Sequence, residues 1–173
     1  MIVIIDISYI VFRNRSSNQT VYNITFPENT TCDLLVIGGG GASGNFGSGT
    51  GAGDVLYFKN VSMSSGKYVI KVGKGGVTGR SDTNVSYIAG YSGENSSIKG
   101  GTLDITAGWG GSYNTIDFTG SQGTRVTGGG GIGCQYDIYG IPTYYAGGCG
   151  GANSDHDTWE YDEMGIGGLG GGR

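Results

Sequence analysis

Residues 33–41 read Asp-Leu-Leu-Val-Ile-Gly-Gly-Gly-Gly, and this stretch decides the fold class. Its four consecutive apolar residues, 34–37, predict a buried β-strand. The glycines that follow end this strand abruptly, and because glycine has no Cβ, another backbone can approach them closely. Further glycine-rich runs occur at residues 73–76, 100–101, 128–131, 147–151 and 165–172. The sequence therefore predicts strands that alternate with glycine runs packed side by side.

Composition excludes several classes of protein. The chain has 173 residues, of which 39 are glycine and only two are proline, so it lacks the Gly-X-Y period of collagen. A net charge of −4 without a run of Arg or Lys argues against nucleic acid as a partner. No segment approaches the roughly 18 apolar residues of a membrane span. We interpret residues 1–12 as a strand, and expect any secretion signal to lie outside this sequence.

Alternation of apolar and polar residues predicts further strands. It is clearest in residues 67–72, and no ten-residue segment shows the 3.6-residue period of an amphipathic helix. Residues 1–12 are expected to form one strand, because their odd positions are apolar: Val3, Ile5, Ile7, Tyr9 and Val11. The same reasoning predicts strands at residues 20–26, 54–59, 61–65, 84–89, 96–99 and 102–107.

The glycine runs need a conformation that offsets their large loss of backbone entropy on folding. Extended left-handed threads with three residues per turn leave their N–H and C=O groups free to bond to neighbouring threads. The alternative is that the runs are disordered linkers. Large residues interrupt the runs at Trp109, Ile132 and Leu169, and a flexible linker does not require them.

The predicted fold class is all-β: a jelly-roll-like β-sandwich with packed polyglycine II-type threads and almost no helix. Residues 1–19 are expected to be an amino-terminal strand, a candidate donor strand, followed by a linker. Residues 20–173 are expected to form the glycine-rich β-sandwich domain.

Five segments in a fixed order resemble the glycine-rich domains of microbial and algal surface proteins, phage tail adhesins and giant-virus proteins. They also resemble, more distantly, the extracellular glycine-rich region of the anaplastic lymphoma kinase receptor. The segments are Ile-Thr-Phe-Pro at 24–27, Leu-Leu-Val-Ile-Gly-Gly-Gly-Gly at 34–41, Gly-Ala-Gly-Asp-Val-Leu-Tyr at 51–57, Gly-Lys-Tyr-Val-Ile-Lys-Val-Gly-Lys-Gly-Gly at 66–76, and Asn-Ser-Ser-Ile at 95–98. The resemblance implies a β-sandwich that carries polyglycine threads and has no enzymatic activity.

One departure from the resembled domains concerns their closing strand. Such domains usually follow their last glycine run with a strand of the type Gly-Ile-Val-Ile-Ile. This chain ends Gly-Gly-Gly-Arg at 170–173 and begins Met-Ile-Val-Ile-Ile at 1–5. We therefore interpret residues 1–12 as the closing strand moved to the front of the chain.

Asparagine sequons are the most prominent local motif. Ten asparagines in a chain with about 18% Ser and Thr predict about two Asn-X-Ser/Thr triplets by chance, and the chain has seven. The functional interpretation is N-glycosylation in a eukaryotic secretory pathway, and the alternative is an AT-rich genome that enriches these residues together. The predicted acceptors are Asn14, Asn18, Asn23, Asn29, Asn60, Asn84 and Asn95.

Three cysteines give an odd count. Cys134 and Cys149 bracket one insertion, and a disulfide between them would close a loop of about 15 residues, which suits an extracellular protein. Cys32 would then be left buried at the entrance of the 33–37 strand. The alternative is three buried thiols in a reducing compartment, and no Cys-X2-Cys pair indicates zinc.

Catalysis and cofactor binding are not expected. The single histidine, His156, lies in the acidic run 153–164, whose spacing is not that of a calcium-binding EF-hand loop. No nucleophile, base and acid arrangement stands out, and no glycine run carries the Gly-Lys-Ser/Thr ending of a phosphate loop. We expect no metal, no cofactor and no enzymatic activity.

The sequence thus predicts a structural subunit of an extracellular glycosylated fibril or surface appendage. Its partners would be further copies of itself and covalent N-glycans, and assembly would be head-to-tail by β-strand donation, with Val3, Ile5, Ile7, Tyr9 and Val11 filling pockets. If residues 1–12 instead insert into their own sheet, the subunit is self-complete. Two other functions stay open: a virion surface or minor capsid protein, and a receptor-binding adhesin that uses the aromatic loop 136–145.

Overall fold

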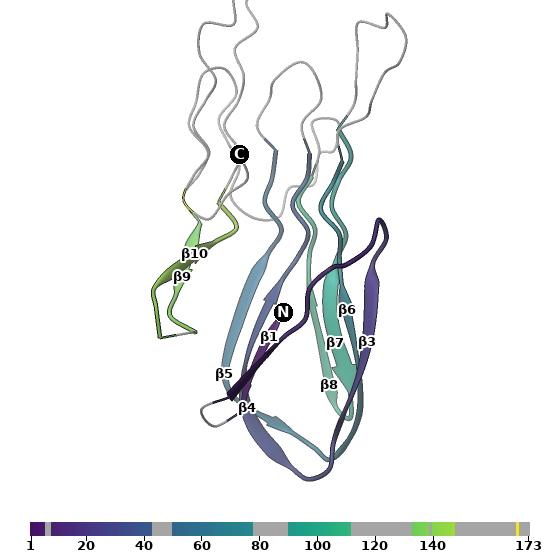
Figure 1. Cartoon of the computed structure of the whole chain (residues 1–173), viewed down its shortest axis with the longest axis vertical. Helices are drawn as coiled ribbons and strands as arrows, with labels where there is room; N and C mark the ends of the chain where they lie inside the picture. Colours follow the sequence, from purple (N-terminus) through teal and green to yellow (C-terminus); the bar gives the residue numbers. More distant parts are fainter. Residues whose placement is uncertain are drawn as a thin grey trace, which may run out of the picture.

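The structure is a computed structural model that describes residues 1–5, 8–42, 50–77, 90–111, 133–138, 140–147 and 169, with residues 3–5 and 8 described by their backbone alone. Within these residues the chain is all-β with no helix, which confirms the all-β class predicted from the sequence (Figure 1). The strands are β1 (Ile2–Ile5), β2 (Ser8–Val11), β3 (Thr20–Phe26), β4 (Thr30–Ile37), β5 (Val55–Met63), β6 (Gly66–Val72), β7 (Ser96–Gly100), β8 (Leu103–Ala107), β9 (Cys134–Tyr136) and β10 (Thr143–Tyr145).

Two antiparallel four-stranded sheets share one hydrophobic core. Their strand orders are β2-β1-β4-β5 and β3-β6-β7-β8. Leu34 and Val36 of β4 pack in one cluster with Tyr68 and Ile70 of β6 and with Ile98 of β7, and each is at most 1% exposed. Burial of each such side chain contributes about 1.5–3 kcal/mol. The arrangement is sandwich-like, with both sheets running along the long axis of the molecule (Figure 1).

β4 is buried on both faces, which explains its continuous apolar run. Leu34 and Val36 face the shared core, whereas Leu35 packs on the opposite face against Ile2 and Ile138. The two-stranded sheet β10-β9 lies on that opposite face. The predicted buried strand at 33–37 is confirmed, although it begins earlier, at Thr30.

The prediction of one strand across residues 1–12 is wrong. The stretch forms an antiparallel hairpin of β1 and β2, in which Ile2 pairs with Val11 and Ile5 with Ser8. Met1 and Phe12 continue this ladder with main-chain hydrogen bonds of 3.0 and 2.9 Å. Because both arms of the hairpin are apolar, alternation alone does not reveal the reversal between them.

Residues 54–65 were expected to form two strands and instead form one, β5, which carries a bulge. Lys59 and Asn60 both lie opposite Asp33 of β4. Asn60 has a φ of 53°, a left-handed conformation that asparagine tolerates. Its main-chain N–H donates to Oδ1 of Asp33 at 2.8 Å, so the Asp33 side chain supplies an acceptor at the bulge.

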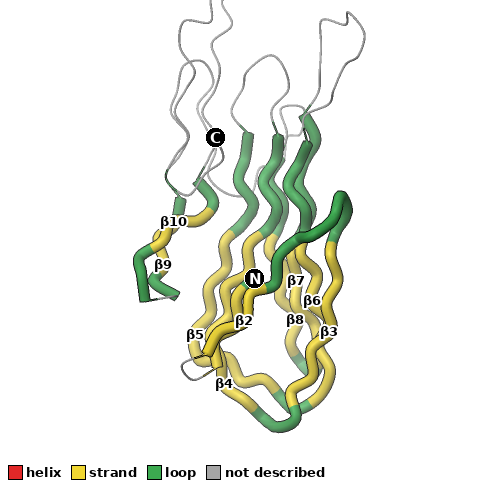
Figure 2. The backbone as a smooth tube through the Cα atoms, in the orientation of Figure 1, coloured by secondary structure: helices red, strands yellow, loops and turns green. Residues whose placement is uncertain are grey.

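Five segments rich in glycine continue the strands at one end of the two sheets, drawn in green in Figure 2. We call residues 38–42, 50–54, 73–77, 90–95 and 108–111 the glycine threads. Thread 38–42 is central because it is hydrogen-bonded to each of the other four. The main-chain bonds run from Gly38 N to Asp54 O (3.0 Å), from Gly39 N to Glu94 O (2.9 Å), from Gly76 N to Gly40 O (2.7 Å) and from Gly110 N to Gly39 O (2.8 Å).

The contacts of the central thread repeat every three residues. The N–H groups of Gly38 and Gly41 donate to thread 50–54, and those of Gly39 and Ala42 donate to thread 90–95. A Cβ added at Gly38 or at Gly41 would overlap carbonyl oxygens of thread 108–111. Extended left-handed threads have this period of three. The predicted sideways bonding is therefore present in the described glycine runs.

Side chains complete the hydrogen bonding between threads and where threads meet strands. Thr50 Oγ1 donates to Gly41 O at 3.1 Å, and Ser96 Oγ accepts from Gly73 N at 3.0 Å. Asp54 accepts from Gly108 N through Oδ2 at 2.9 Å and donates its own N–H to Gly108 O at 3.0 Å. Thr50 and Ser96 are at most 1% exposed, so these bonds satisfy polar groups that would otherwise be buried without partners.

Two alanine substitutions in the central thread should have opposite outcomes. Gly41→Ala places a Cβ onto the main chain of Gly111, so we expect a loss of about 2 kcal/mol or more in the free energy of unfolding. Gly40→Ala meets nothing closer than 3.8 Å and should be close to neutral. Chemical denaturation of both variants measures the difference. Equal stabilities would contradict the close packing of the threads.

Candidate functional site

The amino-terminal hairpin pairs within its own sheet, where β1 is an inner strand and β2 forms the edge. β1 lies between β2 and β4, with Ile2 opposite Leu35. The sequence left two placements open for residues 1–12: the sheet of another copy or their own sheet. In this single chain they lie in their own sheet.

The residues expected to fill pockets do not share one environment. Val11 is half-buried and packs with the cluster around Leu35, whereas Tyr9 is 57% exposed. Val3 and Ile5 are described by their backbone alone, and Ile7 lies outside the described residues. The difference between Tyr9 and Val11 is consistent with the position of β2 at the sheet edge.

Six of the seven sequon asparagines lie within the described residues, and five of them are exposed. Asn84 lies outside the described residues. The exposed acceptors are Asn18 in the linker, Asn23 on β3, Asn29 before β4, Asn60 at the bulge of β5 and Asn95 before β7.

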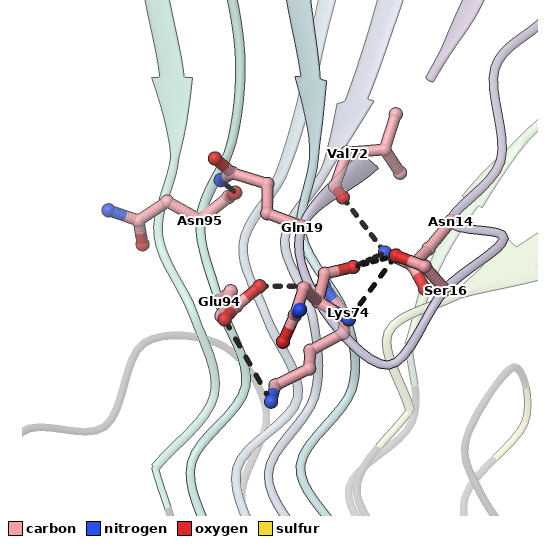
Figure 3. A network of polar contacts seen from close by, with 8 residues as sticks. Asn14, Ser16, Gln19, Val72, Lys74, Glu94 and Asn95 are labelled. Carbon is pink, nitrogen blue, oxygen red and sulfur yellow. Dashed lines mark hydrogen bonds and ion pairs between the residues drawn. The ribbon is translucent and has the colours of Figure 1, made fainter. Parts of the chain in front are cut away.

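Asn14 differs from Asn29, whose side-chain oxygen accepts from Ser65 N at 2.9 Å, because in Asn14 the side-chain nitrogen itself makes the hydrogen bonds. It is half-buried, and its Nδ2 donates to the carbonyl oxygens of Asn18 at 2.7 Å and of Val72 at 3.1 Å (Figure 3). The sequence revealed the sequon but not this second role. Val72 lies 58 residues further along the chain, so no local pattern could have indicated the contact.

Asp33 and Tyr57 form a polar contact on the face of the sheet that β9 and β10 cover. The hydroxyl of Tyr57 donates to Oδ2 of Asp33 at 2.9 Å, and its ring lies 5.1 Å from that of Tyr136. Partial burial, this hydrogen bond and the charges of Asp33 and Asp137 raise the pKa of Tyr57 to about 12. Both oxygens of Asp33 accept hydrogen bonds, one from Asn60 and one from Tyr57, so this carboxylate has a structural role.

Tyr57 should ionise late in an alkaline titration. Because the raised pKa favours the neutral phenol in the folded chain, this contribution to stability is fully present below pH 10 and is lost as the pH rises through about 12. Tyr57→Phe should remove a phenolate signal near pH 12 from the ultraviolet difference spectra. Asp33→Asn, which keeps an acceptor for Asn60, should move that signal to lower pH. An unchanged titration in both variants would contradict the assignment.

The hairpin of β9 and β10 packs two of its tyrosines inward. Tyr136 and Tyr145 join the cluster around Leu35, and the Tyr145 hydroxyl is buried without a hydrogen-bond partner. Partial burial, and then the neighbouring Cys134, raise the pKa of Tyr136. At the tip of the hairpin, Ile141 is 69% exposed.

The cysteines lie in different environments. Cys32 is buried in the core, as expected, and burial together with the neighbouring Asp33 raises its pKa to about 11. Cys134 is exposed on β9. Cys149 lies outside the described residues, so the disulfide between Cys134 and Cys149 stays a prediction.

Within the described part of the chain, no group of three His, Cys, Asp or Glu residues is arranged to hold a metal ion. The acidic run 153–164 with His156 lies outside that part. In the same described ranges, no helix is long and apolar enough to cross a membrane.

Comparison with protein families gives a match over most of the chain. Residues 16–173 match the family model described as a glycine-rich domain. Comparison with curated proteins and with solved structures found no match. The matched range contains all five glycine threads and begins within the linker that follows the amino-terminal hairpin.

Proposed function

The chain belongs to the family of glycine-rich domains, and on this premise we propose that it is a structural subunit of an extracellular, N-glycosylated fibril or surface appendage. The observation that carries the proposal is the exposure of five of the six described sequon asparagines. A glycan must project into solvent, so acceptors buried in the core would have argued against it. This role is non-enzymatic and places the protein outside the cell or on the surface of a cell or virion.

The glycine threads would give such a subunit a stiff end. We assign them to the polyglycine II type, and the three-residue period of their contacts supports this assignment. Their hydrogen bonds join segments that leave both four-stranded sheets, as between Asp54 and Gly108. The bundle therefore resists sliding of one sheet against the other.

Assembly would proceed by exchange of the amino-terminal hairpin between copies. If β1 leaves its sheet, β4 loses its partner along Asp33, Leu34 and Leu35, and an unpaired edge invites another strand. The hairpin of a neighbouring copy can restore the same register. Linker residues 13–19 span at most about 25 Å when extended, which permits this crossing. Each such contact is head-to-tail and does not close, so a filament results.

Cross-linking between copies tests the exchange. One copy carries Ile2→Cys and a second, differently tagged copy carries Leu35→Cys, because these residues are ladder partners whose Cα separation suits a disulfide. Exchange predicts covalent dimers between the two tags after coexpression. The matched control is a mixture of two Ile2→Cys copies, which reports the background from the native cysteines.

The double variant in a single chain reports pairing within one subunit. Cross-links that form only there, in a protein that still builds fibres, would contradict the exchange but not the structural role. Deletion of residues 1–12 should abolish assembly. Normal fibres from the truncated chain would also rule out hairpin exchange.

The glycan at Asn23 should keep one sheet face soluble. Asn23 lies on β3 opposite Val69, and Val21 lies two residues before it on the same face. Val21 is 52% and Val69 38% exposed. Thr25→Ala removes this sequon while Asn23 stays, and we expect lateral clumping of subunits in light scattering.

Thr31→Ala is the control for Asn23, because it removes the Asn29 sequon, whose acceptor lies in the connection between β3 and β4. It should cause little clumping. Equal scattering of the two variants would contradict a protective role for the Asn23 glycan.

A receptor-binding adhesin is the second candidate function. The exposed tip of the β9–β10 hairpin, with Ile141 and Pro142, supports it. Tyr136 and Tyr145 pack inward, so a ligand would contact the tip rather than these rings. Saturable binding of the purified monomer to a cell surface, lost in Ile141→Asp, would favour this candidate over the fibril.

A further inference from the structure

The linker between β2 and β3 is held against the second sheet by a set of hydrogen bonds that we call the linker clasp. Asn14 Nδ2 donates to Asn18 O at 2.7 Å and to Val72 O at 3.1 Å, at the end of β6 (Figure 3). Tyr22 of β3 donates its hydroxyl to Arg13 O at 2.6 Å. The clasp thus fixes the point at which the chain leaves the hairpin.

Neighbouring contacts order the rest of the linker. Arg15 N donates to Thr20 Oγ1 at 3.0 Å, and Ser16 Oγ donates to Asn18 O at 2.7 Å. Gln19 Nε2 donates to Asn95 O at 2.9 Å (Figure 3). Among these bonds, the one from Asn14 to Val72 joins residues 13–16 directly to β6.

The amide of Asn14 cannot both make the clasp and carry a glycan. A primary amide has two N–H donors, and both of them are used here. N-glycosylation replaces one N–H by the bond to the sugar, which must occupy the place of one carbonyl partner. Asn18 differs, because it contributes its main-chain N–H and carbonyl to the linker while its side chain is exposed.

We propose that Asn14 is a modification site that decides where the amino-terminal hairpin docks. When Asn14 is bare, the clasp closes and the hairpin stays in its own sheet. A glycan added to the unfolded chain keeps the clasp open, and the hairpin becomes available to a neighbouring copy. The second half of this inference rests on the proposed function, whereas the competition between glycan and clasp does not.

Hydrogen exchange on unglycosylated protein tests the clasp alone. Asn14→Ala removes both donated bonds, so the β1 amides should exchange about tenfold faster. The amides hydrogen-bonded between β4 and β5 are the internal reference and should stay unchanged. Asn18→Ala is the matched control and should leave β1 protection unchanged. Equal protection of β1 in both variants and the wild type would overturn the clasp.

The glycoprotein secreted from a eukaryotic host tests the modification. Asn14 occupancy is measured by glycopeptide mass spectrometry in monomeric and assembled fractions, with Asn23 as the control acceptor. We expect Asn14 glycans to be enriched at least several-fold in assembled chains, and Asn23 glycans to be equal in both. Equal occupancy of Asn14 in both fractions would overturn the proposal that its glycan decides where the hairpin docks. Absence of a glycan at Asn14 in chains that carry one at Asn23 would overturn it as well.

If the protein is not a fibril subunit, the competition between glycan and clasp can still be tested on the monomer. If no assembly forms, the monomer glycoforms can still be compared by hydrogen exchange. Faster exchange of β1 in chains glycosylated at Asn14 would support the competition between glycan and clasp in that case. Full protection of β1 in such chains would overturn it.

Discussion

The lateral main-chain hydrogen bonds of thread 38–42 are the constraint on which the rest of the structure depends. This thread is bonded to each of the other four, which leave β6 and β8 or enter β5 and β7. Such proximity is possible only without side chains, because a Cβ at Gly38 or Gly41 would overlap a neighbouring carbonyl. The relative position of the two sheets at this end is therefore set by backbone geometry rather than by side-chain packing.

Different interactions offset the loss of backbone entropy in the strands and in the threads. Ordering a glycine run has the largest backbone entropy cost of any sequence, and the run buries no side chains in return. The strands reduce this cost because they hold both ends of each excursion, as β4 and β5 do for threads 38–42 and 50–54. The apolar core at Leu34 and Val36 gives way to hydrogen bonding immediately after Ile37, where the glycines begin. The stretch 33–41 thus contains both the apolar residues of the core and the first glycines of the central thread.

The sequence predicted elements whose determinants are local. Residues 20–26 form β3 as expected, and residues 67–72 lie in β6, because alternation and burial agree there. The amino-terminal hairpin was missed because both its arms are apolar, so a reversal between them leaves the pattern unchanged. The continuous β5 was missed because its bulge depends on Asp33 of another strand, and the clasp of Asn14 depends on Val72, 58 residues away. Contacts between distant segments leave no local pattern in a single sequence.

The positions of the exposed acceptors bear on which sheet edge is open to other copies. In the β2-β1-β4-β5 sheet the edge strands are β2 and β5, and β5 carries Asn60 at its bulge. In the other sheet the edge strands are β3 and β8, and β3 carries Asn23. A bulky glycan on an edge strand obstructs pairing with another chain, as charged residues and bulges do in other sheets. Neither β2 nor β8 carries a sequon, so glycans on β3 and β5 would leave one edge of each sheet open to other copies. The edge at β2 belongs to the hairpin, and the clasp of Asn14 lies in the linker that follows it.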